Sequence, residues 1–278
     1  MKKMKKLLFM LLTSVTLSVQ ADEGMWVMGN LSAKTDSILR SLGFDMTPEE
    51  LYSTEHPSLN DAIVQLGGFC SGVVVSPDGL MFTNHHCGFD AIQDHSTPKS
   101  DYLKNGFFAK TFAEELPNED LYVLFHIKTI DVNDVLLGAV PDDATAEQAD
   151  SIINTTALKL VQLVDYSGKG IESEITPFYK GSRYCLSVYQ RYDDVRLVYA
   201  PPQCLGKYGG DTDNWMWPRQ TCDFSVFRIY ADKDNNPAEY NKDNVPYHPR
   251  KYAHVSTQGY SEGSFAMTIG HPDSTYRY

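Results

Sequence analysis

The first part of the chain has apolar residues at helical spacing. They recur in this way in residues 36–43, 47–53 and 59–67. Thr47 followed by Pro48 is a typical start for the second of these helices. Beyond residue 67 the apolar positions alternate, which is the period of a strand. A region of short helices is therefore predicted to precede a β-rich region.

A turn signal dominates the start of the β-rich region. Two short apolar runs, residues 71–75 and 80–83, are joined by Ser-Pro-Asp-Gly. These residues favour a tight reversal of the chain, so the two runs predict a β-hairpin. Residues 120–136 are predicted to contain a further strand.

The second half of the chain contains one long helical pattern among strands. Residues 142–164 carry apolar side chains at helical spacing. Residues 172–202 and 221–232 are rich in alternating Tyr, Val and Phe, which predicts antiparallel strands. The Gly- and Pro-punctuated residues 247–278 are expected to add one or two strands. We therefore predict a mainly β fold, a barrel or sandwich of short strands with helical additions.

The N-terminus has the layout of a secretory signal peptide. Lysines precede an apolar run from Leu7 to Val19, and Val19-Gln20-Ala21 is a small-x-small cleavage site. An uncleaved membrane anchor is the alternative, but the run is shorter than the roughly 20 residues that span a bilayer. We expect residues 1–21 to be cleaved after Ala21 and residues 22–278 to be exported, to the periplasm or the cell surface.

Charge and cysteine content narrow the classes of function. The formal net charge is −12 and the isoelectric point is about 5.0, with no basic block after the N-terminal segment. Nucleic acids and anionic membranes are therefore poor partner candidates. Export would place the cysteines in an oxidising compartment, and their odd number leaves at least one unpaired within the chain. The cysteines are Cys70, Cys87, Cys185, Cys204 and Cys222.

The first candidate site is the segment "NHHC" at the end of the predicted hairpin. His86 precedes Cys87, and Cys70 lies upstream before the hairpin. A Cys70–Cys87 disulfide would fix the backbone at His86, as suits a catalytic base. The alternatives are a purely structural disulfide and a metal site. A metal is disfavoured because His85 and His86 would point to opposite faces of a strand.

The second candidate site is the segment "GGDTDNWMWPRQTCDFSVFR". Asp223 stands where an apolar strand begins, and a carboxylate entering a packed strand needs a partner. An imidazole N–H is such a partner, which would give a His–Asp pair. A turn-capping role for Asp223 is the alternative. A calcium loop at Asp211 and Asp213 lacks the remaining oxygen ligands of an EF-hand loop.

Together, "CSGVVVSPDGLMFTNHHC" and "GGDTDNWMWPRQTCDFSVFR" closely resemble the bacterial dipeptidyl peptidases of the 7 and 11 type. The resemblance implies an exported serine aminopeptidase with a chymotrypsin-like double β-barrel and an inserted helical domain. Residues 22–278 would form the N-terminal barrel part, without the second barrel and the helical domain. The implied substrates are peptides with a free N-terminus, no cofactor or metal is expected, and the full-length form is expected to be a homodimer.

Motif matching assigns roles to residues of this chain. His86 matches the family's general base and Asp223 the acid that orients it. Asn214 and Trp215 match residues that hold the α-amino group of the substrate. The chain departs from the family pattern at Gln220, where His is usual, and at Cys222, where Gly is usual.

The family's nucleophilic serine has no counterpart in these residues. The family places it in a Gly-Asn-Ser-Gly-Ser-like motif, and the 278 residues contain no Gly-x-Ser-Gly pattern. We expect this chain to be a truncated form that is inactive alone. A catalytically inactive, exported peptide-binding module that retains Asn214 and Trp215 is the alternative.

The resemblance also bears on the odd cysteine. Cys222 stands at the departure next to Asp223 and is expected to be the unpaired residue. Cys70–Cys87 is the first expected disulfide. By elimination, Cys185–Cys204 is expected to be the second.

Overall fold

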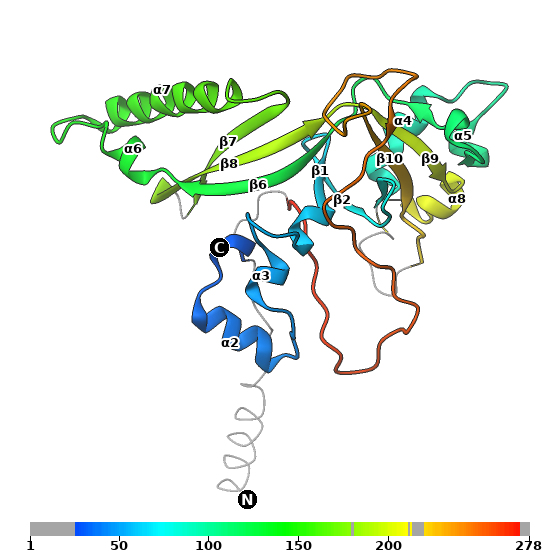
Figure 1. The fold of residues 1–278 in the computed structure, drawn as a ribbon, viewed down its shortest axis with the longest axis horizontal. Helices are drawn as coiled ribbons and strands as arrows, with labels where there is room; N and C mark the ends of the chain where they lie inside the picture. The colour runs from blue at the N-terminus through cyan, green and yellow to red at the C-terminus, as the bar shows by residue number, and fades with distance from the viewer. Residues whose placement is uncertain (1–25, 179–180, 211, 213–219, 273–278) are drawn as a thin grey trace, which may run out of the picture.

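A computed structural model describes residues 26–178, 181–210, 212 and 220–272. The protein is built mainly of antiparallel strands, with a long helix over an extended arm and short helices at the N-terminal end (Figure 1). The strands are β1 (Ile63–Leu66), β2 (Cys70–Val74), β3 (Leu80–Thr83), β4 (Phe107–Phe108), β5 (Leu116–Pro117), β6 (Val123–Asp131), β7 (Ile171–Phe178), β8 (Arg183–Tyr192), β9 (Val195–Ala200), β10 (Ser225–Ala231) and β11 (Val245–Pro246).

The helices connect and cover these strands. Among the described residues most helices are short, and α7, with 20 residues, is the longest. The α-helices are α2 (Ala33–Ser41), α3 (Pro48–Leu51), α4 (Phe89–Asp94), α5 (Tyr102–Asn105), α6 (Asn133–Leu137), α7 (Ala146–Asp165) and α8 (Gln203–Gly206). The 3₁₀ helices are η1 (Met28–Asn30), η2 (Leu59–Ala62), η3 (His86–Gly88) and η4 (Phe112–Glu114). In the described part of the chain, none of the helices is sufficiently long and apolar to cross a membrane.

The sheet closes into a barrel. Its main path runs β4-β9-β10-β3-β2-β1-β6-β8-β7. β5 pairs with β9 at one end of this path, and β6, which follows β5 in the chain, pairs with β1. One continuous segment therefore joins both ends of the β9-β10-β3-β2-β1 sheet. The enclosed core consists of fully buried side chains, including Val64, Leu66, Val74, Met81, Val123, Val195, Leu197, Phe227 and Ile229.

The hairpin predicted from Ser-Pro-Asp-Gly is confirmed. β2 and β3 pair with Val73 opposite Phe82. The Ser76 hydroxyl accepts hydrogen bonds from the backbone N–H groups of Asp78 and Leu80. Gly79 has a φ of +66°, and a Cβ there would lie 2.8 Å from the carbonyl oxygen of Ile229. Only glycine fits this turn without strain.

The predicted long helix is confirmed as α7, which lies on an arm. β6, β7 and β8 extend beyond the barrel, and α7 packs along them (Figure 1). The Thr145 side chain and Gln148 form a capping box at the start of the helix. Val132, Leu136, Leu186 and Val188 are the buried residues of a separate small core in the arm.

Two predictions from apolar spacing are wrong. Residues 63–66 form strand β1 instead of continuing a helix, because β2 and β6 pair with them on both sides. Val64 and Leu66 are fully buried there, so tertiary packing overrides the local pattern. In the region 247–278, which is expected to add one or two strands, residues 247–272 contain no strand, and residues 273–278 lie outside the described residues. This tail is mostly exposed.

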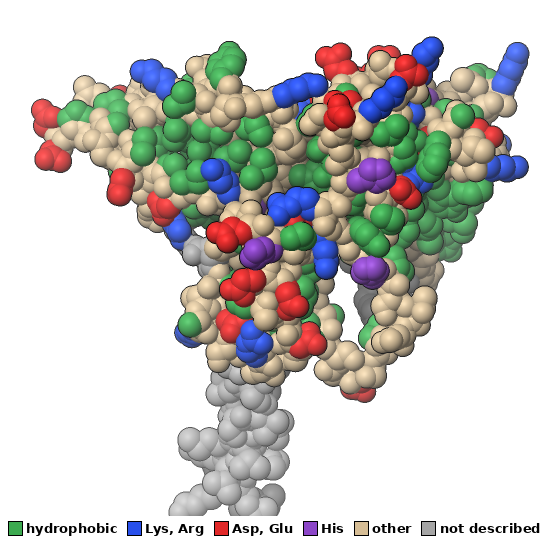
Figure 2. Space-filling model, viewed as in Figure 1, with side chains coloured by type: hydrophobic (Ala, Val, Ile, Leu, Met, Phe, Trp, Pro, Cys, Tyr) green, Lys and Arg blue, Asp and Glu red, His purple; other side chains and the backbone are tan. Residues whose placement is uncertain are grey.

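The tail returns to the N-terminal helices. Leu39, Phe44 and Leu51 form a third small core, against which Phe265 and Ile269 of the tail pack. The rings of Phe44 and Phe265 lie 5.5 Å apart. Acidic and basic side chains are interspersed over the visible face of this region in Figure 2. The tail therefore joins the helices to the rest of the molecule through apolar contacts.

A partly buried aromatic and histidine cluster lies where the tail meets the arm. The Tyr189 ring lies 5.6 Å from that of His126 and 6.2 Å from that of His271. The Tyr189 hydroxyl donates to Glu174 at 2.7 Å. Burial lowers the pKa of His126 to about 4 and also lowers the pKa of His271. Both imidazoles are therefore neutral in the folded protein at neutral pH.

The cluster predicts a loss of stability in mild acid. The folded pKa of His126 lies below its ordinary value of 6.5, so the unfolded chain binds the proton first. The contribution of neutral His126 to the free energy of unfolding is fully present above about pH 6.5 and is lost as the pH falls towards about 4. For His126 this amounts to roughly 2 kcal/mol between pH 7 and pH 5. Urea unfolding of His126→Gln should show a correspondingly smaller loss, whereas the exposed control His56→Gln should behave like the unmodified protein. Equal losses in all three proteins would refute the assignment.

Candidate active site

His86 lies directly after the hairpin, at the start of η3. The preceding His85 has helical backbone angles (φ −62°, ψ −43°). The prediction that the two histidines lie on a strand is therefore wrong. The two side chains nevertheless lie in different environments. The His86 side chain is 51% exposed, whereas His85 is fully buried. Only His86 is accessible to a substrate.

The pairing of β3 with β10 brings Asp223 to His86. Thr83 at the end of β3 lies opposite Ser225 at the start of β10. The chain continues past Thr83 to His86, and Asp223 lies two residues before Ser225. Both residues therefore emerge at the same end of the strand pair, although they are 137 positions apart in the sequence.

The Asp223 carboxylate holds His86 at two points. One oxygen, Oδ2, lies 2.7 Å from Nδ1 of the His86 ring. The other, Oδ1, accepts the backbone N–H of His86 at 3.0 Å. The Asp223 side chain is only 9% exposed, so the carboxylate is largely shielded from water, whereas the His86 ring is not. An ionised carboxylate can only accept, so Nδ1 carries the proton and Nε2 keeps a free lone pair.

Asn84 adds a third support to the carboxylate. Its side-chain Nδ2 donates to the backbone carbonyl of Asp223 at 3.0 Å and to Oδ2 at 3.3 Å. The carbonyl of Asn84 in turn accepts the Ser225 hydroxyl at 2.8 Å. The turn before His86 and the start of β10 are thus joined by side chains as well as by the sheet. Sequence analysis assigned no role to Asn84, because its partners Asp223 and Ser225 lie far away in the chain.

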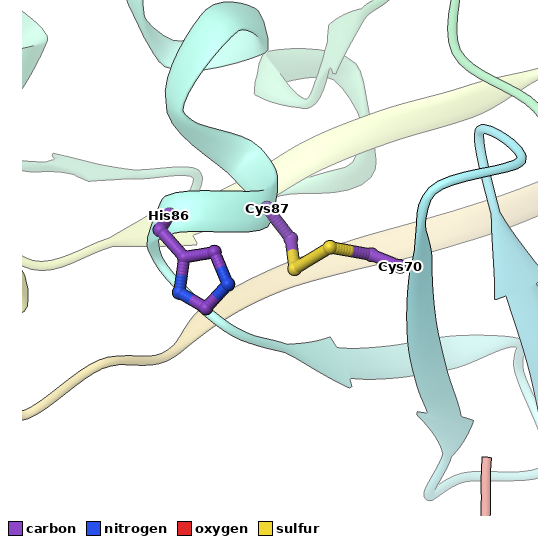
Figure 3. Close-up of side chains that lie close together, drawn as sticks. All are labelled: Cys70, His86 and Cys87. Carbon is purple, nitrogen blue, oxygen red and sulfur yellow. A yellow bond between two sulfur atoms is a disulfide. The ribbon is translucent and has the colours of Figure 1, made fainter. Parts of the chain in front are cut away.

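The expected disulfide between Cys70 and Cys87 is present. It joins the first residue of β2 to the residue after His86, with the Cα atoms 6.1 Å apart. Figure 3 shows the His86 ring beside this bridge. The bridge restrains η3, because Cys87 is covalently attached to the barrel wall.

The same three residues are the one group in the described chain with the spacing of metal ligands. The ligand atoms of Cys70, His86 and Cys87 lie within 4.8 Å of one another. Both sulfur atoms belong to the disulfide and carry no thiolate, which is the form that binds zinc. A single imidazole remains, so the oxidised residues do not fit a zinc site.

His85 has a packing role. A Cβ on Gly206 of α8 would lie 2.5 Å from the His85 ring, so only glycine allows this close approach. Burial lowers the pKa of His85, which favours a neutral imidazole. The ring therefore supports α8, the short helix that approaches the chain before Asp223.

The predicted second disulfide is absent from the structure. Cys185 and Cys204 are both free thiols, so the prediction that they form a disulfide is wrong. Cys185 is buried in β8 of the arm, opposite Asp131 and Thr176, whereas Cys204 is exposed on α8 beside the barrel. Assignment by elimination ignored this separation. Asn214 and Trp215 lie outside the described residues.

The support from Asn84 can be tested by replacing its amide. We expect Asn84→Leu to lower the hydrogen-exchange protection of the His86 backbone amide roughly five-fold, because a hydrogen bond worth about 1 kcal/mol is lost from its acceptor. The global unfolding midpoint should change little, since Asn84 is exposed. Asn154→Leu on α7 is the matched control. Unchanged protection of His86 in Asn84→Leu would show that the amide does not hold the carboxylate.

Relatives of known type cover nearly the whole chain but only part of their own length. The chain is 46% identical over 279 residues to dipeptidyl-peptidase 7 of Porphyromonas endodontalis, covering 99% of this chain and 34% of the relative. It is 42% identical over 271 residues to the Asp/Glu-specific dipeptidyl-peptidase of Flavobacterium psychrophilum, covering 98% of this chain and 38% of the relative. The chain thus spans little more than a third of the length of these relatives.

A solved structure has the same fold. Porphyromonas endodontalis DPP11 in complex with the dipeptide Arg-Glu aligns with a TM-score of 0.78 and 42% sequence identity, over 87% of this chain and 36% of that chain. The mainly β, chymotrypsin-like fold expected for the chain is therefore confirmed. The family model for peptidase S46 matches residues 21–278. Because this family model covers nearly the whole chain and the relatives are more than 40% identical to it, the chain belongs to the peptidase S46 family.

Proposed function

We propose that this chain forms the base-bearing part of a serine-type dipeptidyl peptidase, which releases dipeptides from the N-termini of peptides. The observation that carries the proposal is the 2.7 Å contact between Nδ1 of His86 and the carboxylate of Asp223. Relatives named as dipeptidyl-peptidases, and a solved relative in complex with a dipeptide, support the reaction class.

His86 acts as the general base in this proposal. The Asp223 carboxylate holds the proton on Nδ1 and directs Nε2 outwards, where the ring is exposed. Nε2 takes the proton of a serine hydroxyl as the oxygen attacks the peptide carbonyl. It then gives that proton to the leaving amine. Asp223 stays ionised and stabilises the imidazolium that forms between these steps.

The nucleophile comes from outside these 278 residues. The sequence has no Gly-x-Ser-Gly pattern, and the chain spans little more than a third of the length of the relatives it matches. A serine on a further part of the polypeptide would approach the exposed side of His86. The chain by itself would then be inactive.

The substrate specificity of the proposed enzyme depends on the free N-terminus of the peptide. The family resemblance assigns capture of the α-amino group to Asn214 and Trp215. Both belong to the segment of sequence between α8 and Asp223. Export by the N-terminal signal would bring the enzyme to extracellular or periplasmic peptides.

The proposal predicts a defined pattern of activity. The 278-residue chain should release no dipeptide from dipeptidyl reporter substrates, whereas a polypeptide that continues to a Gly-x-Ser-Gly segment should. In that longer polypeptide, His86→Ala should lower turnover by about 10⁶-fold and Asp223→Asn by about 10⁴-fold. His56→Ala is the control for a histidine outside the site.

Three outcomes would contradict the proposal. Turnover by the 278-residue chain that His86→Ala abolishes would mean that these residues contain another nucleophile. Equal release from N-acetylated and free peptides would exclude capture of the α-amino group. Binding of free but not acetylated peptides, measured by calorimetry without turnover in the longer polypeptide, would instead support an inactive peptide-binding module.

A further inference from the structure

Two exposed thiols lie on neighbouring segments beside Asp223. Cys204 is in α8, and Cys222 immediately precedes Asp223; both are free and exposed. The backbone N–H of Cys222 donates to the carbonyl of Leu205, the residue after Cys204, at 3.0 Å. The backbone therefore holds the two cysteine-bearing segments side by side.

A second set of hydrogen bonds fixes the same approach. The Thr221 hydroxyl lies 2.9 Å from the carbonyl oxygen of Gly206 and 3.3 Å from that of Leu205. One residue step and one hydrogen-bonded peptide contact separate Cys204 from Cys222. A residue step is about 3.8 Å, and disulfides join Cα atoms about 4.4–6.8 Å apart. A disulfide would require the Cα atoms of Cys204 and Cys222 to come within that range, and Cys204 is carried by α8, a helix of only four residues.

The third free cysteine does not compete for either thiol. Cys185 is buried in β8, where the strand pairs with β6 and β7 on both sides. Burial also raises the pKa of the Cys185 thiol, which lowers its thiolate fraction and its reactivity. Cys204 and Cys222 are thus the accessible pair among the described cysteines.

We propose that Cys204 and Cys222 form a redox-sensitive pair that closes to a disulfide in an oxidising compartment. The oxidant is another disulfide, on a small molecule or a protein. The thiolate of one cysteine attacks it and releases one thiol, which leaves a mixed disulfide. The second cysteine thiolate then attacks that bond and releases the other thiol. One new S–S bond forms, both cysteine S–H bonds are lost, and the oxidant leaves as two thiols.

Formation of the Cys204–Cys222 disulfide would restrain two parts of the chain next to Asp223. It would attach the residue before Asp223 covalently to α8, whose Gly206 packs against His85. It would also join the ends of the segment in which the sequence places Asn214 and Trp215. The proposal concerns the thiols alone and stands whether or not the chain is part of a peptidase.

Peptide mapping of the purified 278-residue chain tests the pair directly. After incubation with oxidised glutathione and alkylation of the remaining thiols, trypsin should release residues 197–207 linked to residues 220–228. The linked product should lack the two thiol hydrogens, and reduction should separate it into its two peptides. Incubation in urea should give much less of this product, because the backbone contacts that align the thiols are lost.

Matched variants identify the partners. Cys185→Ser should leave the linked product unchanged, whereas Cys204→Ser and, separately, Cys222→Ser should abolish it and leave the other cysteine as its glutathione adduct or as an alkylated thiol. Far-ultraviolet circular dichroism checks that each variant is folded. The proposal is overturned if folded protein carries separate glutathione adducts on Cys204 and Cys222, or alkylated thiols at both positions, without the linked peptide.

Discussion

The pairing of β3 with β10 is the constraint on which the candidate site depends. These strands come from opposite ends of the barrel-forming sequence, and their register places Thr83 opposite Ser225. A slip of one residue would turn the side chains of β10 to the other face of the sheet. Phe227 would then leave the core, and Asp223 would no longer meet His86. The burial of Phe227 therefore stabilises the geometry of a hydrogen bond at the barrel surface.

The interactions around Asp223 reinforce one another because they join the same two segments. The carboxylate accepts from the ring and from the backbone of His86, while Asn84 and Ser225 bond across the same junction. The Cys70–Cys87 bridge holds η3 from its other side. A carboxylate this shielded would be costly to bury without donors. The donors that relieve this cost also set the orientation of the imidazole.

Local signals explain what could be predicted from the sequence. The Ser-Pro-Asp-Gly turn and the apolar helical pattern of α7 depend on neighbours in the chain, and both elements are present as expected. The apolar spacing predicts helix at Ile63–Leu66 because three apolar residues in so short a segment fit either period, and only the pairing with strands on both sides decides. Asn84 could not be recognised for a related reason, since its partner lies 139 positions away. The prediction of a disulfide between Cys185 and Cys204 is wrong because the number of cysteines in a sequence says nothing about their positions in space.

The closure of the barrel by the segment that runs from β5 into β6 has a consequence for how the molecule assembles. This segment must meet β9 at one end and β1 at the other, and β10 must return to β3 across the whole arm. Contacts between such distant parts of a chain slow folding, because a long loop loses entropy before any of its contacts form. The arm has the opposite character, since β7, β8 and α7 are close in sequence and share their own small core. The arm is thus expected to form early, as a folded hairpin that shortens the effective loop between β6 and β9, and the barrel to close last.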